Sequence, residues 1–130
     1  MDIWAVACIL TSMEKISFIK MHGLGNDFVL VDNRKYNINY DQTGIRSICD
    51  RRRGIGCDQL LVISDADGHA DVNMRIFNPD GTEAEACGNG TRCVADHIMD
   101  NLIGSKVTIE TKAGVLAATR GSNGLVQVDM

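Results

Sequence analysis

Cys87 stands directly before a glycine-rich segment, and this position decides its possible chemistry. Gly88, Asn89 and Gly90 come next, and after them apolar residues recur every three or four positions. This spacing predicts a helix that begins just after the cysteine. The first backbone N–H groups of a helix have no partners within it and carry partial positive charge. They could stabilise a thiolate at Cys87, and a substrate carboxylate could bind the same groups.

The residues around Cys87 support two interpretations. Gly88 and Gly90 allow the backbone to approach a ligand closely, and Asn89 can both donate and accept hydrogen bonds. A thiol whose pKa is tuned by such surroundings can serve as a general acid or base. The same short motif also fits an inert buried thiol in a turn, so Cys87 alone does not decide between them.

The other cysteines indicate reduced thiols rather than a disulfide framework. The chain has five cysteines, an odd number, and no Cys-x-x-Cys motif. Cys49 and Cys93 fall on apolar helical positions typical of a core, Cys57 suits either a core or a functional role, and Cys8 lies near the N-terminus. The three histidines lack metal-ligand spacing, so we expect no metal site. Reduced thiols favour a cytoplasmic protein.

Composition narrows the class of protein. The chain has 130 residues, of which 45% are hydrophobic, enough for the core of one ordinary domain. Its net charge of −4 does not favour binding to nucleic acid or to an anionic membrane surface. The basic run Arg51–Arg53 could bind an anion, but such runs are more often solvated helix ends, and we interpret it in that way. The apolar run Ile3–Leu10 is too short to span a membrane.

The first residues are interpreted as an addition to the domain. Met13 is followed by Glu-Lys and resembles an alternative start. We therefore expect residues 1–12 to be an N-terminal extension that packs weakly, and residues 13–130 to form the domain proper.

Hydrophobic periodicity predicts an α+β domain with mostly antiparallel strands around a helix. The helices are expected at 41–52, with Asp41 as N-cap and glycines after Arg53 ending it, and at about 88–102, with Gly104 as C-cap. Asn78–Gly81 is expected to be a turn, because Pro79 presets φ and glycine tolerates positive φ. The expected strands are 16–20, 28–31, 59–63, 72–77, 106–111, 114–119 and 125–130.

Four stretches together resemble one enzyme family, diaminopimelate epimerase. They are, in chain order, residues 21–28 (MHGLGNDF), 54–59 (GIGCDQ), 75–81 (RIFNPDG) and 87–92 (CGNGTR). The stretch 107–114 (VTIETKAG) and the closing residues 126–130 (VQVDM) fit the same pattern. The resemblance covers residues 13–130.

The resemblance implies a fold and an activity. The family interconverts LL- and meso-2,6-diaminopimelate for lysine and peptidoglycan synthesis, and uses no pyridoxal phosphate or other cofactor. Two similar α+β halves close over the substrate, and each half supplies one cysteine. One thiolate removes the α-proton, and the other thiol delivers a proton to the opposite face.

The resemblance also assigns roles to residues. It implies that Cys87 is one of the two catalytic thiols and that Gly88 and Asn89 bind the substrate α-carboxylate. It implies further side-chain contacts to substrate from Asn26, Gln59 and Asn78, although polar residues of these types also form turns and caps. Two positions depart from the family pattern: Cys57 replaces the usual Ala or Phe, and Thr91 replaces a common Ala.

The family is about twice as long as this chain, and the second cysteine has no counterpart here. We therefore expect the N-terminal half of an epimerase, inactive without its C-terminal half, with a homodimer as a further expectation for the whole protein. Two alternatives remain: a related two-thiol isomerase, such as a proline racemase-like or phenazine-synthesis enzyme, and a non-catalytic binding domain.

Overall fold

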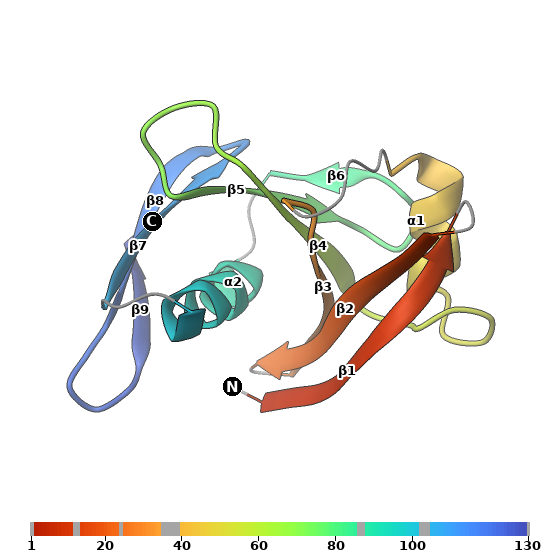
Figure 1. Cartoon of the computed structure of the whole chain (residues 1–130), viewed down its shortest axis with the longest axis horizontal. Coiled ribbons are helices and arrows are strands. Elements are labelled where there is room, and N and C mark those ends of the chain that lie inside the picture. The colour runs from red at the N-terminus through yellow and green to blue at the C-terminus, as the bar shows by residue number, and fades with distance from the viewer. Residues whose placement is uncertain are drawn as a thin grey trace.

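The computed structural model describes residues 2–11, 14–23, 25–34, 40–85, 88–101 and 105–129. Within them, one curved sheet of nine strands surrounds helix α2 (Gly88–Asn101), and helix α1 (Gln42–Cys49) lies outside the curve (Figure 1). The strands are β1 (Asp2–Thr11), β2 (Glu14–Gly23), β3 (Asn26–Asp32), β4 (Gln59–Ser64), β5 (Val72–Phe77), β6 (Glu83–Ala84), β7 (Lys106–Thr111), β8 (Gly114–Arg120) and β9 (Val126–Asp129).

The strand order is β1-β2-β3-β4-β5-β7-β8-β9, with β6 paired to β5. Most neighbours are antiparallel, but β3 and β4 are parallel, as are β5 and β7. Parallel neighbours need a long crossover connection. Helix α1 lies within the first crossover and helix α2 within the second. The predicted α+β class, with a curved and mostly antiparallel sheet around a central helix, is confirmed.

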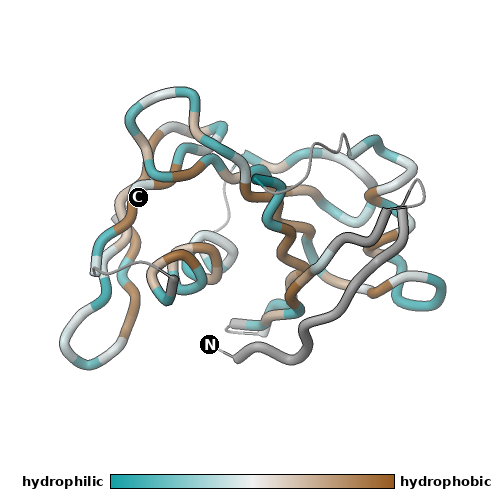
Figure 2. Tube along the Cα trace, in the orientation of Figure 1, coloured by the Kyte–Doolittle hydropathy of each residue, from teal (hydrophilic) through white to brown (hydrophobic). Residues whose placement is uncertain are grey.

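The inner core lies between the sheet and α2. Helix α2 contacts β2, β3, β4, β7, β8 and β9, and Figure 2 shows apolar residues along it and along the strands that face it. The fully buried members include Phe28, Leu61, Ile76, Ile98 and Ile109. Burying each such side chain stabilises the fold by about 1.5–3 kcal/mol. This core holds the helix that begins immediately after Cys87.

A second core covers the outer face of the central strands. Val29, Val31, Leu60 and Val62 point away from α2 and pack against α1 through Ile45. Successive residues of β3 and β4 therefore enter opposite cores, which explains their continuous apolar runs. Strand β5 is different, because its alternating burial leaves Arg75 exposed, as the sequence pattern predicted.

The predicted N-cap of α1 is confirmed, but its predicted end is wrong. The Asp41 carboxylate accepts a hydrogen bond from the Gly44 amide at 2.7 Å. The helix ends at Cys49 instead of residue 52 because Asp50 is extended, with φ −66° and ψ 120°. The Asp50 carboxylate accepts hydrogen bonds from the Arg52 and Arg53 amides, and this local turn competes with helix. The glycines after Arg53 belong to the loop beyond the helix.

The segment interpreted as an extension forms a strand. Residues 2–11 make up β1 and pair antiparallel with β2, from Asp2 opposite His22 to Thr11 opposite Glu14. Met13, the expected alternative start, lies outside the described residues, so that start stays a prediction. Gly104, the expected C-cap of α2, also lies outside them.

Candidate functional site at one edge of the sheet

Three of the predicted substrate contacts lie where the central strands meet one edge of the sheet. Asn26 begins β3, Gln59 begins β4, and Asn78 directly follows β5. Strand register aligns them, because Phe28 is opposite Gln59 and Leu60 is opposite Phe77. The parallel β3–β4 pair and the antiparallel β4–β5 pair thus bring all three polar residues to the same edge.

The N-terminus of α2 meets this edge through two of the predicted residues. The Asn89 amide Nδ2 donates a hydrogen bond to Asn26 Oδ1 at 3.0 Å, across 63 positions of sequence. Gly88 is the first residue of the helix, and both it and Asn89 are half-buried. The N-terminus of α2 therefore lies beside the start of β3.

The other two predicted contacts also bind each other. Gln59 Nε2 donates to Asn78 Oδ1 at 3.2 Å, and Asn78 Nδ2 donates to the Thr82 hydroxyl at 3.1 Å. The expected turn after β5 is confirmed by the 2.9 Å bond from the Gly81 amide to the Asn78 carbonyl, with Gly81 at φ +92°. The Asn78 side chain is thus held at the edge by its own turn and by β4.

Helix α1 holds that turn in place. The Asp80 carbonyl accepts hydrogen bonds from Arg46 Nε at 2.8 Å and from Gln42 Nε2 at 3.3 Å. A Cβ at Gly81 would lie only 2.2 Å from Gln42 Cγ, so the turn requires glycine for space as well as for φ. Asn78 therefore has a rigid support on both sides.

Cys87, the predicted catalytic thiol, lies outside the described residues, as does Ala86 before it. Its sequence neighbour Gly88 opens α2, so the residue precedes the helix that the sequence predicted. Its catalytic role stays a prediction. The cysteines assigned to the core are confirmed there: Cys49 and Cys93 are buried, and so is Cys57.

Two aspartates fasten the starts of β3 and β4 to each other. Asp27 follows Asn26, and Asp58 precedes Gln59. The Asp27 amide donates to Asp58 Oδ2 at 3.0 Å, and the Asp58 amide donates to Asp27 Oδ1 at 2.9 Å. This reciprocal pair of hydrogen bonds fixes the relative position of the two strands that present Asn26 and Gln59.

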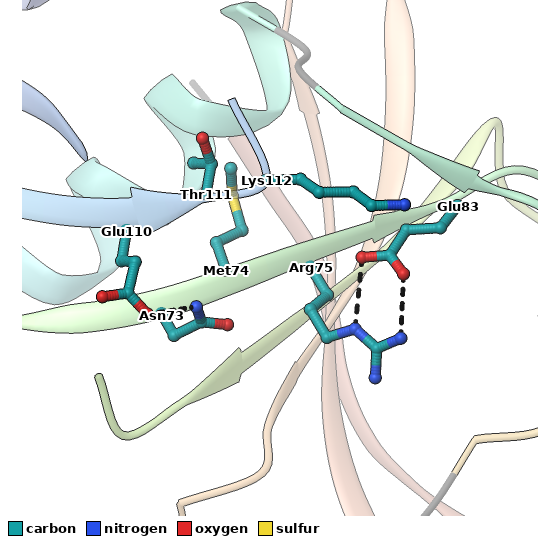
Figure 3. Close-up of a pocket in the computed structure, with 7 residues that line it drawn as sticks. All are labelled: Asn73, Met74, Arg75, Glu83, Glu110, Thr111 and Lys112. Atoms are coloured by element: carbon teal, nitrogen blue, oxygen red, sulfur yellow. Dashed lines mark hydrogen bonds and ion pairs between the residues drawn. The ribbon is translucent and has the colours of Figure 1, made fainter. Parts of the chain in front are cut away.

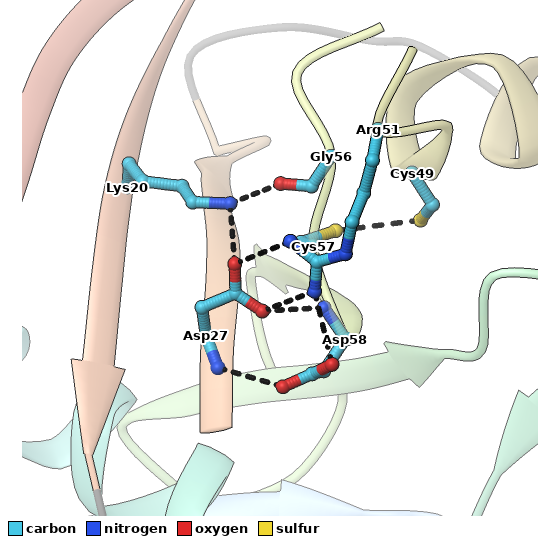
Figure 4. Close-up of polar contacts among 7 residues, drawn as sticks. All are labelled: Lys20, Asp27, Cys49, Arg51, Gly56, Cys57 and Asp58. Atoms are coloured by element: carbon cyan, nitrogen blue, oxygen red, sulfur yellow. Dashed lines mark hydrogen bonds and ion pairs between the residues drawn. The ribbon is translucent and has the colours of Figure 1, made fainter. Parts of the chain in front are cut away.

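Two cations neutralise these carboxylates (Figure 4). Arg51 binds Asp27 through both terminal nitrogens, at 2.8 and 2.9 Å, and reaches Asp58 at 3.0 Å. Lys20, from β2, lies 2.8 Å from Asp27 Oδ2 and also donates to the Gly56 carbonyl. The cluster Lys20–Asp27–Arg51–Asp58 therefore has balanced charge and joins β2, β3, β4 and the loop after α1.

The cluster makes Asp27 a strongly ionised group. Hydrogen bonds from Arg51 hold the pKa of Asp27 well below its ordinary range, and Lys20 acts in the same direction. Burial opposes this shift, because the Asp27 side chain is only 8% exposed. Asp27 is thus a fixed negative charge at neutral pH and does not serve as a proton donor there.

Sequence reasoning missed this cluster. Arg51 is exposed, as expected for a solvated helix end, and so are Arg52 and Arg53. The expectation did not include the bonds from Arg51 to Asp27 and Asp58. One signal was available: each aspartate is adjacent in sequence to a predicted site residue. The pairing itself connects residues 24 and 31 positions apart, which no local pattern reveals.

A surface pocket is lined by residues of β5, β6 and β7 and by Lys112 (Figure 3). Its volume is about 300 Å³, and Arg75 and Glu83 on its rim bind each other at 2.8 Å. None of the predicted site residues lines it; the lining residues are Asn73, Met74, Arg75, Glu83, Glu110, Thr111 and Lys112.

The part of the chain that the structure describes contains no cluster of three or more His, Cys, Asp or Glu side chains that could hold a metal ion. Within the same ranges, no helix has the length and apolar character needed to cross a membrane.

Known proteins resemble this chain in sequence and in fold. A family model described as diaminopimelate epimerase matches residues 18–130. Diaminopimelate epimerase of Phenylobacterium zucineum is 50% identical over 113 residues, covering 87% of this chain and 40% of the relative. That of Sphingopyxis alaskensis is 52% identical over 107 residues, covering 82% of this chain and 38% of the relative. This chain thus spans about two fifths of these relatives' length.

A solved structure has a similar fold. The phenazine biosynthesis protein of the PhzF family from Bacillus anthracis superposes with a TM-score of 0.61 at 23% identity. The match covers 97% of this chain and 38% of that protein.

Proposed function

This chain belongs to the diaminopimelate epimerase family, and we propose that it is the N-terminal half of a cofactor-independent enzyme interconverting LL- and meso-2,6-diaminopimelate. The observation that carries the proposal is that Asn26, Gln59 and Asn78 lie at one edge of the sheet, where Asn26 binds Asn89 at the N-terminus of α2. Cys87 is adjacent in sequence to that N-terminus. Membership of this family supports a role for the whole enzyme in lysine biosynthesis.

Cys87 is proposed as the acid/base group on one face of the substrate α-carbon. Inversion at carbon needs a base on one face and an acid on the other, both able to exchange protons near neutral pH. A thiol can do this when a helix N-terminus lowers its pKa. Cys87 directly precedes the first residue of α2 in the sequence, so we expect the field of the helix N-terminus to act on it.

The edge residues are proposed to bind and orient the substrate. Gly88 and Asn89 would receive the α-carboxylate, because backbone N–H groups at a helix start favour negative charge. The same groups would stabilise charge that develops on the carboxylate when the α-proton leaves. Asn26, Gln59 and Asn78 carry amides that can donate and accept hydrogen bonds to the amino and carboxylate groups of the substrate.

A second half is proposed as the necessary partner. One thiol alone returns a proton to the face from which it took it, so inversion would depend on water. The part of the relatives beyond this chain would supply the second thiol and close the site to solvent, which strengthens electrostatic interactions inside it. We place the assembled enzyme in the cytoplasm and expect a homodimer.

A chimera tests the proposal. The chain is fused to the portion of the Phenylobacterium zucineum relative that lies beyond the matched region, and the isolated chain is assayed beside it. Exchange of the substrate α-proton in D₂O, followed by NMR, measures proton removal, and a chiral separation measures inversion. We expect the chimera to epimerise diaminopimelate, and the isolated chain to be slower by at least the roughly 10²–10⁴-fold contribution of one general acid.

Two outcomes would contradict the proposal. Full epimerisation by the isolated chain would show that no second half is needed. A folded chimera that is inactive on diaminopimelate but racemises proline would assign the chain to a related isomerase instead.

A further inference from the structure

Two cysteines outside the proposed active site lie in direct contact. The Cys57 thiol donates a hydrogen bond to Cys49 Sγ, with the sulfur atoms 3.4 Å apart. Cys49 is 3% exposed and Cys57 2%, and both belong to the outer core beneath α1. Figure 4 shows the sulfur pair beside the charged cluster. A disulfide bond of about 2.0 Å would require the sulfur atoms to approach by little more than an ångström.

Backbone hydrogen bonds, rather than chance, bring the two thiols together. After α1 ends, the chain turns back so that the amides of Ile55 and Gly56 donate to the Ile48 carbonyl at 3.1 and 3.0 Å. The Cys57 amide then donates to the Cys49 carbonyl at 3.3 Å. Gly56 has φ +80°, and a Cβ there would lie 2.9 Å from Arg51 Cα. The return loop therefore depends on glycine directly before Cys57.

The surroundings distinguish the two sulfur atoms. The hydrogen bond from Cys57 lowers the pKa of the Cys49 thiol, and the charges of Lys20 and Arg51 act in the same direction. The same hydrogen bond raises the pKa of the donor Cys57, and burial adds to that increase. Cys49 is therefore the better nucleophile of the pair. Cys57 is the thiol that would react with Cys49 after Cys49 is oxidised.

We propose that Cys49 and Cys57 are a redox-active pair that a small hydroperoxide converts into a disulfide. The Cys49 thiolate attacks the O–O bond and takes one oxygen as sulfenic acid, and the other oxygen leaves as water after protonation. The Cys57 sulfur then attacks the Cys49 sulfur, loses its proton and displaces the second water. Two thiols are oxidised to one disulfide while one hydrogen peroxide is reduced to two waters.

The cytoplasmic location proposed above implies a transient bond of regulatory type and not a permanent one. Cytoplasmic disulfides, where they form, are usually catalytic or redox-sensing. This bond would tie the end of α1 to the entry of β4, immediately beside Arg51 and Asp58. A hydroperoxide is small and uncharged, which suits access to a pair that is almost fully buried.

Peptide mapping tests the pair directly. The folded chain is treated with hydrogen peroxide, remaining thiols are blocked with iodoacetamide, and the protein is digested with trypsin without reduction. Trypsin separates all five cysteines, placing Cys49 on residues 47–51 and Cys57 on residues 54–75. We expect the 47–51/54–75 peptide pair to be the dominant disulfide product and to disappear on treatment with dithiothreitol.

Matched controls make the result decisive. Cys57→Ala should abolish the linked peptide pair and leave Cys49 as a sulfenic or higher acid, whereas Cys93→Ala should leave the linked pair unchanged. Oxidation in urea should scatter the disulfides over several cysteine pairs. The proposal is overturned if both peptides remain alkylated after oxidation of the folded chain, if Cys49 links mainly to another cysteine, or if the folded and unfolded chains give the same disulfides.

Discussion

The centre of the sheet, formed by β3 and β4, and its C-terminal flank, formed by β7, β8 and β9, differ in how deeply their strands are buried. In β3 and β4 nearly every residue is buried, because α2 covers one face and α1 the other. In β8 only Ala118 is fully buried, and Val115 is 60% exposed. The centre carries the charged cluster and the starts of the strands that hold Asn26 and Gln59. The flank carries none of the predicted site residues.

The difference shows how the fold keeps the polar side chains at the starts of β3 and β4 in fixed positions. Strands covered on both faces cannot shift without disrupting two cores, so side chains at their ends keep a fixed position. The cluster of Asp27, Arg51 and Asp58 adds polar fastening at that edge. The flank covers α2 with one face only. Its other face is exposed, so substitutions there remove few packing contacts. Substitutions should therefore have large effects at the centre and small ones on the flank.

The largest effect is expected from the residue proposed to transfer the proton. Cys87→Ala in the chimera should slow α-proton exchange by about 10²–10⁴-fold, since one general acid/base is removed. The melting temperature should stay nearly unchanged. Cys49→Ala, which removes a buried thiol at the outer core, is the matched control and should retain the exchange rate. Equal losses in both variants would contradict the assignment of Cys87.

Truncating one buried and one exposed leucine allows the contributions of the centre and the flank to stability to be compared. Leu61 is fully buried in the inner core, and Leu125 is 69% exposed before β9. Leu61→Ala should lower the free energy of unfolding by about 2–5 kcal/mol, because it leaves a cavity. Leu125→Ala should change it by no more than about 0.5 kcal/mol. Urea denaturation measures both, and similar values would remove the distinction between the two regions.

The charged cluster predicts a pH dependence. The lowered pKa of Asp27 means that its contribution to stability is present above its unfolded pKa, about 3.9, and is lost as pH falls below that value. Asp27→Asn should cost about 3 kcal/mol at neutral pH, because it removes the buried negative charge that Lys20 and Arg51 bind.

The difference in stability between the wild type and Asp27→Asn should shrink as the pH is lowered from about 4 toward about 2, because the folded-state pKa of Asp27 lies well below its unfolded value. Asp67→Asn, at an exposed aspartate, is the control and should cost little at any pH. A gap that stays constant across this range would contradict the role of the Asp27 charge.

The smallest effect is expected from the ion pair on the outer surface of β5 and β6. Arg75 binds Glu83 at 2.8 Å and lies over the Phe77 ring, 4.8 Å from its centre, but its side chain is 52% exposed. A double-mutant cycle with Arg75→Ala and Glu83→Ala should give a coupling free energy of about 0.2–1 kcal/mol. A coupling as large as the cost of Asp27→Asn would mean that exposed and buried charges are equivalent here.

The features predicted from the sequence are those encoded by local pattern. Alternating residues predicted β5, a continuous apolar run predicted β4, and Asp41 predicted the start of α1. The Asn78–Gly81 turn followed from proline and glycine chemistry. In each case the physical cause acts within a few residues, so a single sequence is sufficient to show it.

The features that escaped prediction depend on distant partners. Arg51 looks like a solvated cation until the fold brings Asp27 and Asp58 to it. In the sequence Cys49 looks like a core residue and Cys57 suits either a core or a functional role, and only the return loop shows that their thiols are in contact. The grouping of predicted site residues at one edge likewise required the strand order. One exception is local: helix α1 ends early because the Asp50 carboxylate accepts hydrogen bonds from the amides of Arg52 and Arg53.

The two parallel strand pairs also have a consequence for folding. The hairpins β1–β2–β3 and β7–β8–β9 join neighbours in sequence and can form early. The β3–β4 and β5–β7 contacts close segments 31 and 37 residues long, as their bridging hydrogen bonds show. Because closing long loops slows folding, the rate should be limited by the crossovers through α1 and α2. The edge that gathers the candidate site would then be among the last parts of the molecule to assemble.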